Sequence, residues 1–177
     1  AKLSGENVVL KAKDTSIDGI VTRKTDYNTH DSGTGRMVAA YRHEENGVKY
    51  QNAASSTSQS FAGSSISATN ALSLENSGNI NIKGAQITAG TLNVDAANLT
   101  TGGERTTNRK NSSSNKSKAL WFNNTVSSDT EETLHATKIK VNETADVKVK
   151  GKVDLKATKL NVGKTLSLQG EQGIKLQ

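Results

Sequence analysis

The 177-residue chain contains no cysteine and no proline, and only 3% of its residues are aromatic. Without cysteine, it can form neither a disulfide framework nor a thiolate metal site. Proline lacks a backbone hydrogen-bond donor and therefore disrupts a strand that is paired on both edges. The lack of proline favours a structure in which most strands are flanked by other strands on both sides.

Hydrophobic residues are also scarce, at 32% of the chain. The sequence contains no long apolar run that would form a membrane-spanning helix, and no signal-peptide pattern. A conventional two-layer core would be poorly filled at this composition. Two interpretations remain: partial disorder, or a fold whose core is a thin stack of small aliphatic side chains.

The spacing of the aliphatic residues favours the thin stack. Between residues 64 and 102 they occur mostly in pairs separated by one residue, and Gly, Asn, Ser or Ala stand between the pairs. This alternation places both members of a pair on one face of a short strand, and the intervening residues favour turns. Leu72 and Leu92 are 20 residues apart, which is about one coil of a solenoid. The pattern returns in residues 136–177, where Val147 and Leu166 are 19 residues apart.

We therefore predict an all-β fold, a right-handed parallel β-helix with coils of about 20 residues. A single coil cannot bury its aliphatic side chains, whereas stacked coils bury them continuously and pair their backbone edges. Asn and Thr at the turns can form side-chain ladders between coils, although the sequence alone does not show such ladders. The side chains expected in one elongated core are Val8, Leu10, Leu72, Leu74, Ile80, Ile82, Leu92, Val94, Val147, Val149, Val153, Leu155, Leu166 and Leu168.

Two polar segments interrupt the repeat, at about 20–63 and 102–135. Each has a basic, hydroxyl-rich approach, a short apolar stretch (MVAAY at 37–41, ALWF at 119–122) and a Ser/Thr-rich end. Their composition alone is typical of linkers. Because each has an apolar anchor and returns to the repeat in register, we predict ordered excursions from a single β-helix spanning 1–177. Both are expected to form antiparallel strands that lie beside each other on one flank, with a hairpin turn at Asn46-Gly47.

Few residues suggest catalysis or metal binding. The histidines His30, His43 and His135 do not have zinc-site spacing. The neighbouring carboxylates, such as Asp14 with Asp18 or Glu131 with Glu132, are expected in solvated turns. We therefore expect no enzymatic activity, no metal and no cofactor. The alternative is a carbohydrate-active β-helix enzyme, a polysaccharide lyase or hydrolase, which would need convergent carboxylates.

The net charge of +6 indicates an anionic partner or simply a solvated lysine-rich surface. The most concentrated basic run lies in the second excursion and is followed by aromatic residues. Three interpretations are open: contact with glycans or a cell surface, binding of nucleic acid, and a solubilising decoration whose aromatic residues pack on the helix flank. The composition favours the solubilising decoration; of the two binding interpretations we favour contact with glycans or a cell surface over nucleic acid, with the candidate contacts Arg105, Arg109, Lys110, Lys116, Lys118 and Trp121.

The run NINIKGAQITAGTLNVDAANLTTGGERTTNRKNSSSNKSK at 79–118 resembles the haemagglutinin repeats of the filamentous-haemagglutinin family. The matching features are the strand–GAQI–strand step at 80–94, the Asn98-Leu99 step and the Ser/Asn/Lys-rich run at 108–118. Family members often continue with a Gly/Val-rich stretch, whereas this chain continues with ALWFNNTVSS. The family comprises exoproteins of the two-partner secretion pathway, among them filamentous adhesins and contact-dependent growth inhibition exoproteins.

The resemblance implies a structural and adhesive stalk segment of a large secreted protein at the bacterial cell surface. Such a protein is exported by an outer-membrane secretion partner, and it serves in adhesion or in the presentation of a toxic C-terminal domain. Its expected partners are glycans or a receptor on host or neighbouring cells. The chain begins (AKLSGENVVLKA) and ends (GEQGIKLQ) in mid-pattern, so we expect it to be a fragment of the larger protein.

Overall fold

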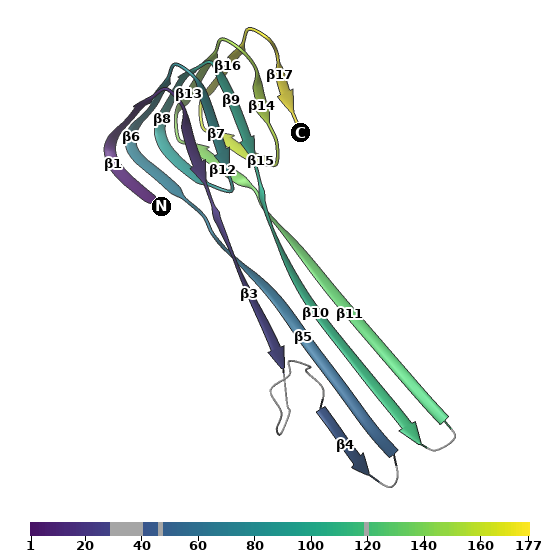
Figure 1. The fold of residues 1–177 in the computed structure, drawn as a ribbon. Helices are drawn as coiled ribbons and strands as arrows, with labels where there is room; N and C mark the ends of the chain where they lie inside the picture. Colours follow the sequence, from purple (N-terminus) through teal and green to yellow (C-terminus); the bar gives the residue numbers. More distant parts are fainter. Residues whose placement is uncertain (29–40, 46–47, 119–120) are drawn as a thin grey trace. The chain divides into compact units, whose positions relative to one another are not determined.

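The computed structural model describes residues 1–28, 41–45, 48–118 and 121–177, which form β-strands joined by turns (Figure 1). The predicted all-β class is confirmed. No helix capable of crossing a membrane is found in these described ranges. The chain divides into two compact units, one formed by Ala1–Val21, Phe61–Arg105 and Leu134–Gln177, the other by Thr22–Ser60 and Thr106–Thr133.

The first unit contains two parallel sheets that share one core. The larger sheet consists of β1 (Lys2–Ala12), β6 (Ser65–Asn76), β8 (Gln86–Ala96), β12 (Thr137–Val141), β13 (Thr144–Val149), β15 (Thr158–Val162) and β16 (Thr165–Gly170). The smaller sheet has the order β17 (Ile174–Leu176), β14 (Val153–Leu155), β9 (Asn98–Gly102), β7 (Asn79–Lys83) and β2 (Thr15–Asp18).

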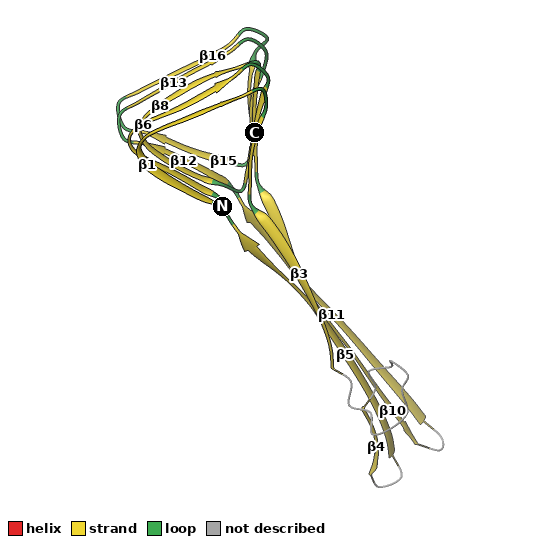
Figure 2. Ribbon diagram, turned by 60° about the vertical axis from the view of Figure 1, so that its left-hand side comes forward, coloured by secondary structure: helices red, strands yellow, loops and turns green. Residues whose placement is uncertain are grey.

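Each passage of the chain through this unit adds strands beside those of the previous passage. The first residues of β8 pair with β12 and its last residues pair with β13, so the larger sheet bends between these two regions. In Figure 2, β12 and β15 lie along one side of the unit, and β13 and β16 lie along another. The strands of the smaller sheet follow, which gives three straight segments in each passage.

The strand register places equivalent residues of successive passages next to each other. Val8 pairs with Leu72, and Leu72 pairs with Leu92, which confirms the predicted 20-residue spacing. The 19-residue spacing from Val147 to Leu166 is wrong, because Val147 pairs with Leu168. The residue beside Leu92 is Ala145, a small inward side chain that a search for large aliphatic residues passes over.

Most of the predicted core residues are buried in a single cluster. Leu10 and Leu168 are only partly buried against it, and Leu166 is 43% exposed, which corrects its predicted place in the core. Leu166 lies on β16, which pairs only with β13 in the described ranges, so no further strand there covers it. The cluster also contains larger aliphatic residues, Ile17, Ile66, Ile87, Leu99, Ile139 and Val141, and small residues that the sequence did not single out, Ala68, Ala85, Ala89, Ala96 and Ala145.

A ladder of polar side chains joins the turns that precede the smaller sheet. Asp14 Oδ1 accepts a hydrogen bond from the backbone N of Asn79 at 2.7 Å, and Asn79 Oδ1 accepts one from Asn98 Nδ2 at 2.8 Å. Asn98 Oδ1 in turn accepts a bond from the backbone N of Lys152 at 2.9 Å. These bonds satisfy turn backbone groups that the sheet does not pair.

The second unit is a five-stranded sheet with β4 paired to β5 and the order β11-β10-β5-β3 for the rest. Residues Arg109 to Ser117 of β10 pair antiparallel with Thr57 to Lys49 of β5, so the two predicted excursions form antiparallel strands in direct contact, as expected. Glu45 pairs with Val48, as in the predicted hairpin, although Asn46-Gly47 and residues 37–40 and 119–120 of the apolar stretches lie outside the described residues. The strand bounds are β3 (Ile20–Asn28), β4 (Tyr41–Glu45), β5 (Val48–Ala62), β10 (Glu104–Lys118) and β11 (Trp121–His135).

Polar side chains connect the strands of this second sheet. The backbone N of Gln59 donates to Asn108 Oδ1 at 3.0 Å, and the backbone N of Thr107 donates to Gln59 Oε1 at 2.6 Å. Ser128 donates to Asn111 Oδ1 at 2.9 Å, which links β11 to β10. In these bonds the Asn, Gln and Ser side chains of the excursions connect neighbouring strands.

We predict that Ile82→Asp abolishes cooperative folding of the first unit. Ile82 is 2% exposed, and an unpaired carboxylate in this apolar position costs several kcal/mol. Ile82→Ala should destabilise by about 2–5 kcal/mol through the cavity it leaves. Thermal melting followed by circular dichroism measures both. The matched control is Leu166→Asp, which should melt close to the wild type because that side chain is already solvated; equal melting of Ile82→Asp and wild type would refute the core.

Candidate functional site

The basic residues predicted from sequence are divided between the two units. Arg105 belongs to the first unit, whereas Arg109 and Lys110 belong to the second, and all three are exposed. Lys116 and Lys118 lie near the end of β10, and Trp121 begins β11. The side chains of these last three residues lie outside the described part of the chain.

Arg109 and Lys110 do not form one basic patch. They are consecutive in an extended strand, so their side chains leave opposite faces of the sheet. Arg109 Nε donates to Thr130 Oγ1 at 3.4 Å. Lys110 lines a hollow of about 430 Å³ together with Asp26, Asp129 and several serine residues. Two carboxylates beside Lys110 reduce the attraction of this hollow for an anion.

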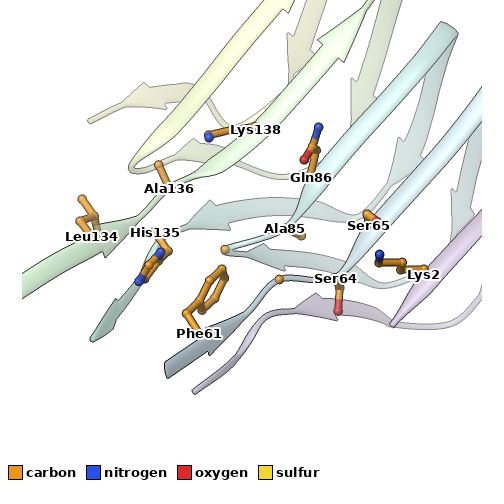
Figure 3. Close-up of a pocket in the computed structure, with 12 residues that line it drawn as sticks. Lys2, Phe61, Ser64, Ser65, Ala85, Gln86, Leu134, His135, Ala136 and Lys138 are labelled. Atoms are coloured by element: carbon orange, nitrogen blue, oxygen red, sulfur yellow. The ribbon is translucent and has the colours of Figure 1, made fainter. Parts of the chain in front are cut away.

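A second hollow, of about 490 Å³, lies in the first unit (Figure 3). One side of it is formed by Lys2, Ser65, Gln86 and Lys138, which come from the starts of β1, β6, β8 and β12. Lys2 pairs with Ser65, Ser65 with Gln86, and Gln86 with Lys138, so the four residues form one row across four strands. Three strand spacings separate its ends, which is about 14 Å. We call this hollow the groove.

The other side of the groove carries an aromatic pair. The rings of Phe61 and His135 are stacked, with centroids 4.1 Å apart and an angle of 11° between their planes. Two glycines make room for Phe61: a Cβ on Gly19 would lie 2.2 Å from Phe61 Cε2, and one on Gly84 would lie 2.9 Å from Phe61 Cζ. Gly84 also has a φ of +55°, which a side chain would strain. Glycine at positions 19 and 84 therefore leaves the space that the Phe61 ring occupies.

The sheet surface beside the groove carries charge of one sign. At the starts of β1, β6 and β8 (residues 2–4, 65–67 and 86–88) and in β12 and β15, the outward positions are occupied by lysine and otherwise by Ser, Thr, Gln and Asn. The lysines do not form ion pairs with any residue in the described ranges. We call them the lysine face: Lys2, Lys138, Lys140 and Lys159.

The neighbouring surface, over β13 and β16 and the later parts of β1 and β6, is charge-balanced. Lys11 bridges to Glu75 at 2.8 Å, and Lys148 bridges to Asp146 at 2.8 Å. Hydrogen bonds from Lys11 and Ser73 hold the pKa of Glu75 below its ordinary value. The hydrogen bond from Lys148 likewise lowers the pKa of Asp146, against the opposing effect of desolvation. Lysines on this surface are therefore neutralised, unlike those beside the groove.

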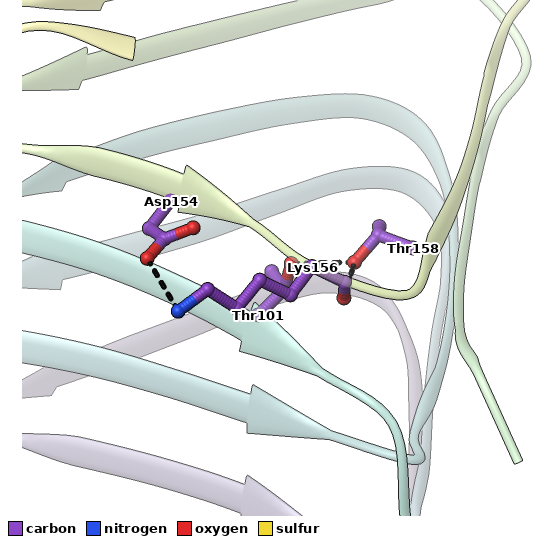
Figure 4. Close-up of polar contacts among 4 residues, drawn as sticks. All are labelled: Thr101, Asp154, Lys156 and Thr158. Atoms are coloured by element: carbon purple, nitrogen blue, oxygen red, sulfur yellow. Dashed lines mark hydrogen bonds and ion pairs between the residues drawn. The ribbon is translucent and has the colours of Figure 1, made fainter. Parts of the chain in front are cut away.

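The smaller sheet shows the same compensation (Figure 4). Lys156 bridges to Asp154 at 3.0 Å, and nearby Thr158 donates to the backbone O of Lys156 at 2.8 Å. The hydroxyl of Thr158 also bonds that of Thr101, a fully buried side chain. These contacts satisfy the hydroxyls of Thr101 and Thr158 at the edge of the core, so we assign this cluster a structural role.

The remaining titratable groups do not converge. Among the residues the structure describes, no three His, Asp or Glu side chains lie together in a way that could hold a metal ion. His135 is stacked on Phe61, Asp14 accepts the bonds of the turn ladder, and Asp18 accepts a bond from Ser16. His30 lies outside the described residues, as do the side chains of His43, Glu44 and Glu45.

The sequence did not indicate Lys2, Gln86, Lys138, Phe61 or His135 as one site. Lys2 and Lys138 are far apart in the chain, and only the strand register brings them into one row. A weak signal exists, because each residue of the row directly precedes an aliphatic residue, and these aliphatic residues pair with one another across the strands: Leu3, Ile66, Ile87 and Ile139. An alignment of the repeats on those aliphatic residues would have shown that the four residues of the row lie side by side.

Comparison with known proteins finds no matching protein family, no matching curated protein and no matching solved structure. The functional assignment therefore depends on the chain's own residues, chiefly the strand register, the groove and the lysine face.

We predict that Lys148→Met raises the pKa of Asp146 toward the ordinary aspartate value of 3.8. The depressed pKa means that the ion pair stabilises the fold above that ordinary value and that its contribution is lost as the pH falls through the lower folded-state value. An NMR titration of the Asp146 carboxyl measures the shift. Lys140→Met is the control and should leave the titration unchanged; an identical midpoint in Lys148→Met and wild type would contradict the assigned cause.

Proposed function

We propose that the first unit is a stretch of right-handed parallel β-helix and that the chain is a stalk segment of a large secreted bacterial surface exoprotein with an adhesive role. The observation that carries this proposal is the continuous register of parallel strands. Val8, Leu72, Leu92, Ala145 and Leu166 occupy equivalent positions in successive passages of the chain. This arrangement is what repeated stacking of one coil on the next would produce.

Such stacking suits a stalk. Each coil would add one strand spacing, about 4.8 Å, to the length of the rod and would bury its aliphatic side chains against the preceding coil. The inward positions are occupied by aliphatic residues, as at Leu72 and Leu74 and the residues paired with them on neighbouring strands. Outward positions are free to carry polar groups, so a long surface becomes available for contact with other cells.

The sequence resemblance supports the same proposal. The segment NINIKGAQITAG spans β7, the turn at Gly84 and the start of β8, and the Ser/Asn/Lys-rich run lies in β10. In the filamentous-haemagglutinin family such repeats belong to adhesins and to contact-dependent growth inhibition exoproteins. We propose accordingly a secreted protein at the cell surface, an outer-membrane secretion partner, and glycans or a receptor on host or neighbouring cells as ligands.

We propose binding without turnover. A glycoside hydrolase or lyase needs a carboxylic acid or another acid–base group poised over the sugar. Several carboxylates of the first unit are instead engaged by lysines, as in the pairs of Asp146 with Lys148 and Glu143 with Lys164. An assay for polysaccharide cleavage tests the rival hypothesis, a carbohydrate-active β-helix enzyme.

Beads coated with the purified chain should attach to monolayers of glycan-bearing cells, because the polar outer surface would make many weak contacts at once. Attachment is counted under flow. Beads coated with the unfolded Ile82→Asp variant and beads coated with albumin are the controls. Retention no greater than that of albumin would reject the adhesive function.

Incubation of the chain with acidic and neutral polysaccharides should release neither new reducing ends nor unsaturated uronate products. Both are measured against protein concentration. Product formed in proportion to the chain, and lost in the Ile82→Asp variant, would establish the enzyme instead.

A further inference from the structure

We propose that the groove of the first unit binds a linear acidic polysaccharide that lies along the row of Lys2, Ser65, Gln86 and Lys138. This inference deepens the proposed adhesive function and rests on it for its biological setting. The binding step itself can be tested with the isolated chain. The residues that line the groove do not include any of the basic residues of the second excursion that the sequence indicated.

The arrangement of charge in the row favours a linear polymer over a small anion. Lys2 and Lys138 stand at the two ends of the row, about 14 Å apart, and Lys159 lies beside Lys138 on the next strand. A single sugar could reach one end only. A chain with anionic groups at intervals could engage both ends at once, so its second contact would be intramolecular and strongly favoured.

The middle of the row is suited to the neutral parts of a sugar chain. Ser65 offers a hydroxyl, and the exposed Gln86 offers an amide that can both donate and accept hydrogen bonds. On the opposite side, Phe61 and His135 supply an apolar aromatic surface against which the C–H face of a sugar ring can pack (Figure 3). The groove thus combines end charges, central polar groups and an aromatic side.

The lysine face extends the positive potential beyond the groove. Lys140 stands on the same strand as Lys138, and the outward positions described on this surface carry no Asp or Glu. Attraction of this kind concentrates an anionic polymer and weakens with added salt. Single-stranded nucleic acid carries the same charge, but it binds mainly through open aromatic faces on which bases stack. Phe61 and His135 already cover one face of each other, which favours the polysaccharide.

The test measures binding of the full chain to defined oligosaccharides by calorimetry at low ionic strength. The probes are a sulfated uronate oligomer (heparin fragment), a carboxylate-only oligomer (hyaluronan fragment), neutral dextran and single-stranded DNA. We expect the acidic oligosaccharides to bind and dextran not to bind. Comparing heparin with hyaluronan tells whether sulfate or carboxylate is the preferred anion.

The variant Lys2→Gln/Lys138→Gln/Lys159→Gln should lower affinity for the acidic oligosaccharide by on the order of tenfold or more. The matched control is Lys150→Gln/Lys152→Gln/Lys175→Gln, which removes the same charge from exposed positions of the same unit that do not line the groove. It should change affinity by no more than about twofold at constant salt. All six side chains are exposed, so both variants should fold.

Gln86→Leu probes the neutral contacts. It should weaken binding of the oligosaccharide severalfold, because leucine can neither donate a hydrogen bond to a sugar hydroxyl nor accept one from it. Equal losses in the two lysine triples would show diffuse attraction and overturn the groove. Tighter binding of DNA, or a loss confined to Arg109→Glu/Lys110→Glu, would also overturn it.

The two proposals can fail separately. Unchanged bead attachment by the groove triple, together with unchanged oligosaccharide binding, would refute the groove and leave adhesion standing. Oligosaccharide binding that depends on the groove, without attachment of beads to cells, would refute the adhesive function alone.

Discussion

The hydrogen-bonded register between parallel strands is the constraint on which the rest of the first unit depends. Because the backbone ladder fixes each residue beside one residue of the neighbouring strand, side chains of one kind line up in columns. Leu72 lies beside Leu92 in the core, Asn79 beside Asn98 at the turns, and Lys138 beside Lys159 on the surface. The same register also assembles the groove from residues that are distant in sequence.

A register that aligns like residues also aligns like charges, which is destabilising for direct neighbours. Much of the first unit avoids this cost by alternating sign. Lys11 is opposite Glu75 across two strands, and Asp146 and Lys148 pair within one strand. Lys138 and Lys159 are direct neighbours of like charge, as Glu75 and Asp95 also are, but in the described part of the chain no carboxylate forms an ion pair with either lysine. An anionic ligand bound in the groove would reduce the repulsion between these two lysines.

The sequence predicted those features that strand alternation encodes directly. The all-β class, the inward positions of Leu72, Ile80 and Ile82, and the contact between the two excursions follow from local pattern and from where the repeat is interrupted. The sequence-based prediction failed where the burial of a residue depends on which strand lies beside it. Leu166 has the right pattern but lacks a covering strand, and Ala145 is inward although alanine carries little signal. The groove was out of reach because it needs the register across two long insertions.

The two units use the same extended backbone under different restraints. In the second unit the side chains of 123–133 are exposed on both faces, and polar bonds such as that between Ser128 and Asn111 connect its strands. Substitutions of these exposed side chains disturb little packing. In the groove, Phe61 is fitted against Gly19 and Gly84, so a change at any of the three requires a compensating change at the others. The second unit can therefore change its surface residues, and with them its binding partners, without loss of packing. The groove is suited to a ligand that stays the same, such as an acidic polymer.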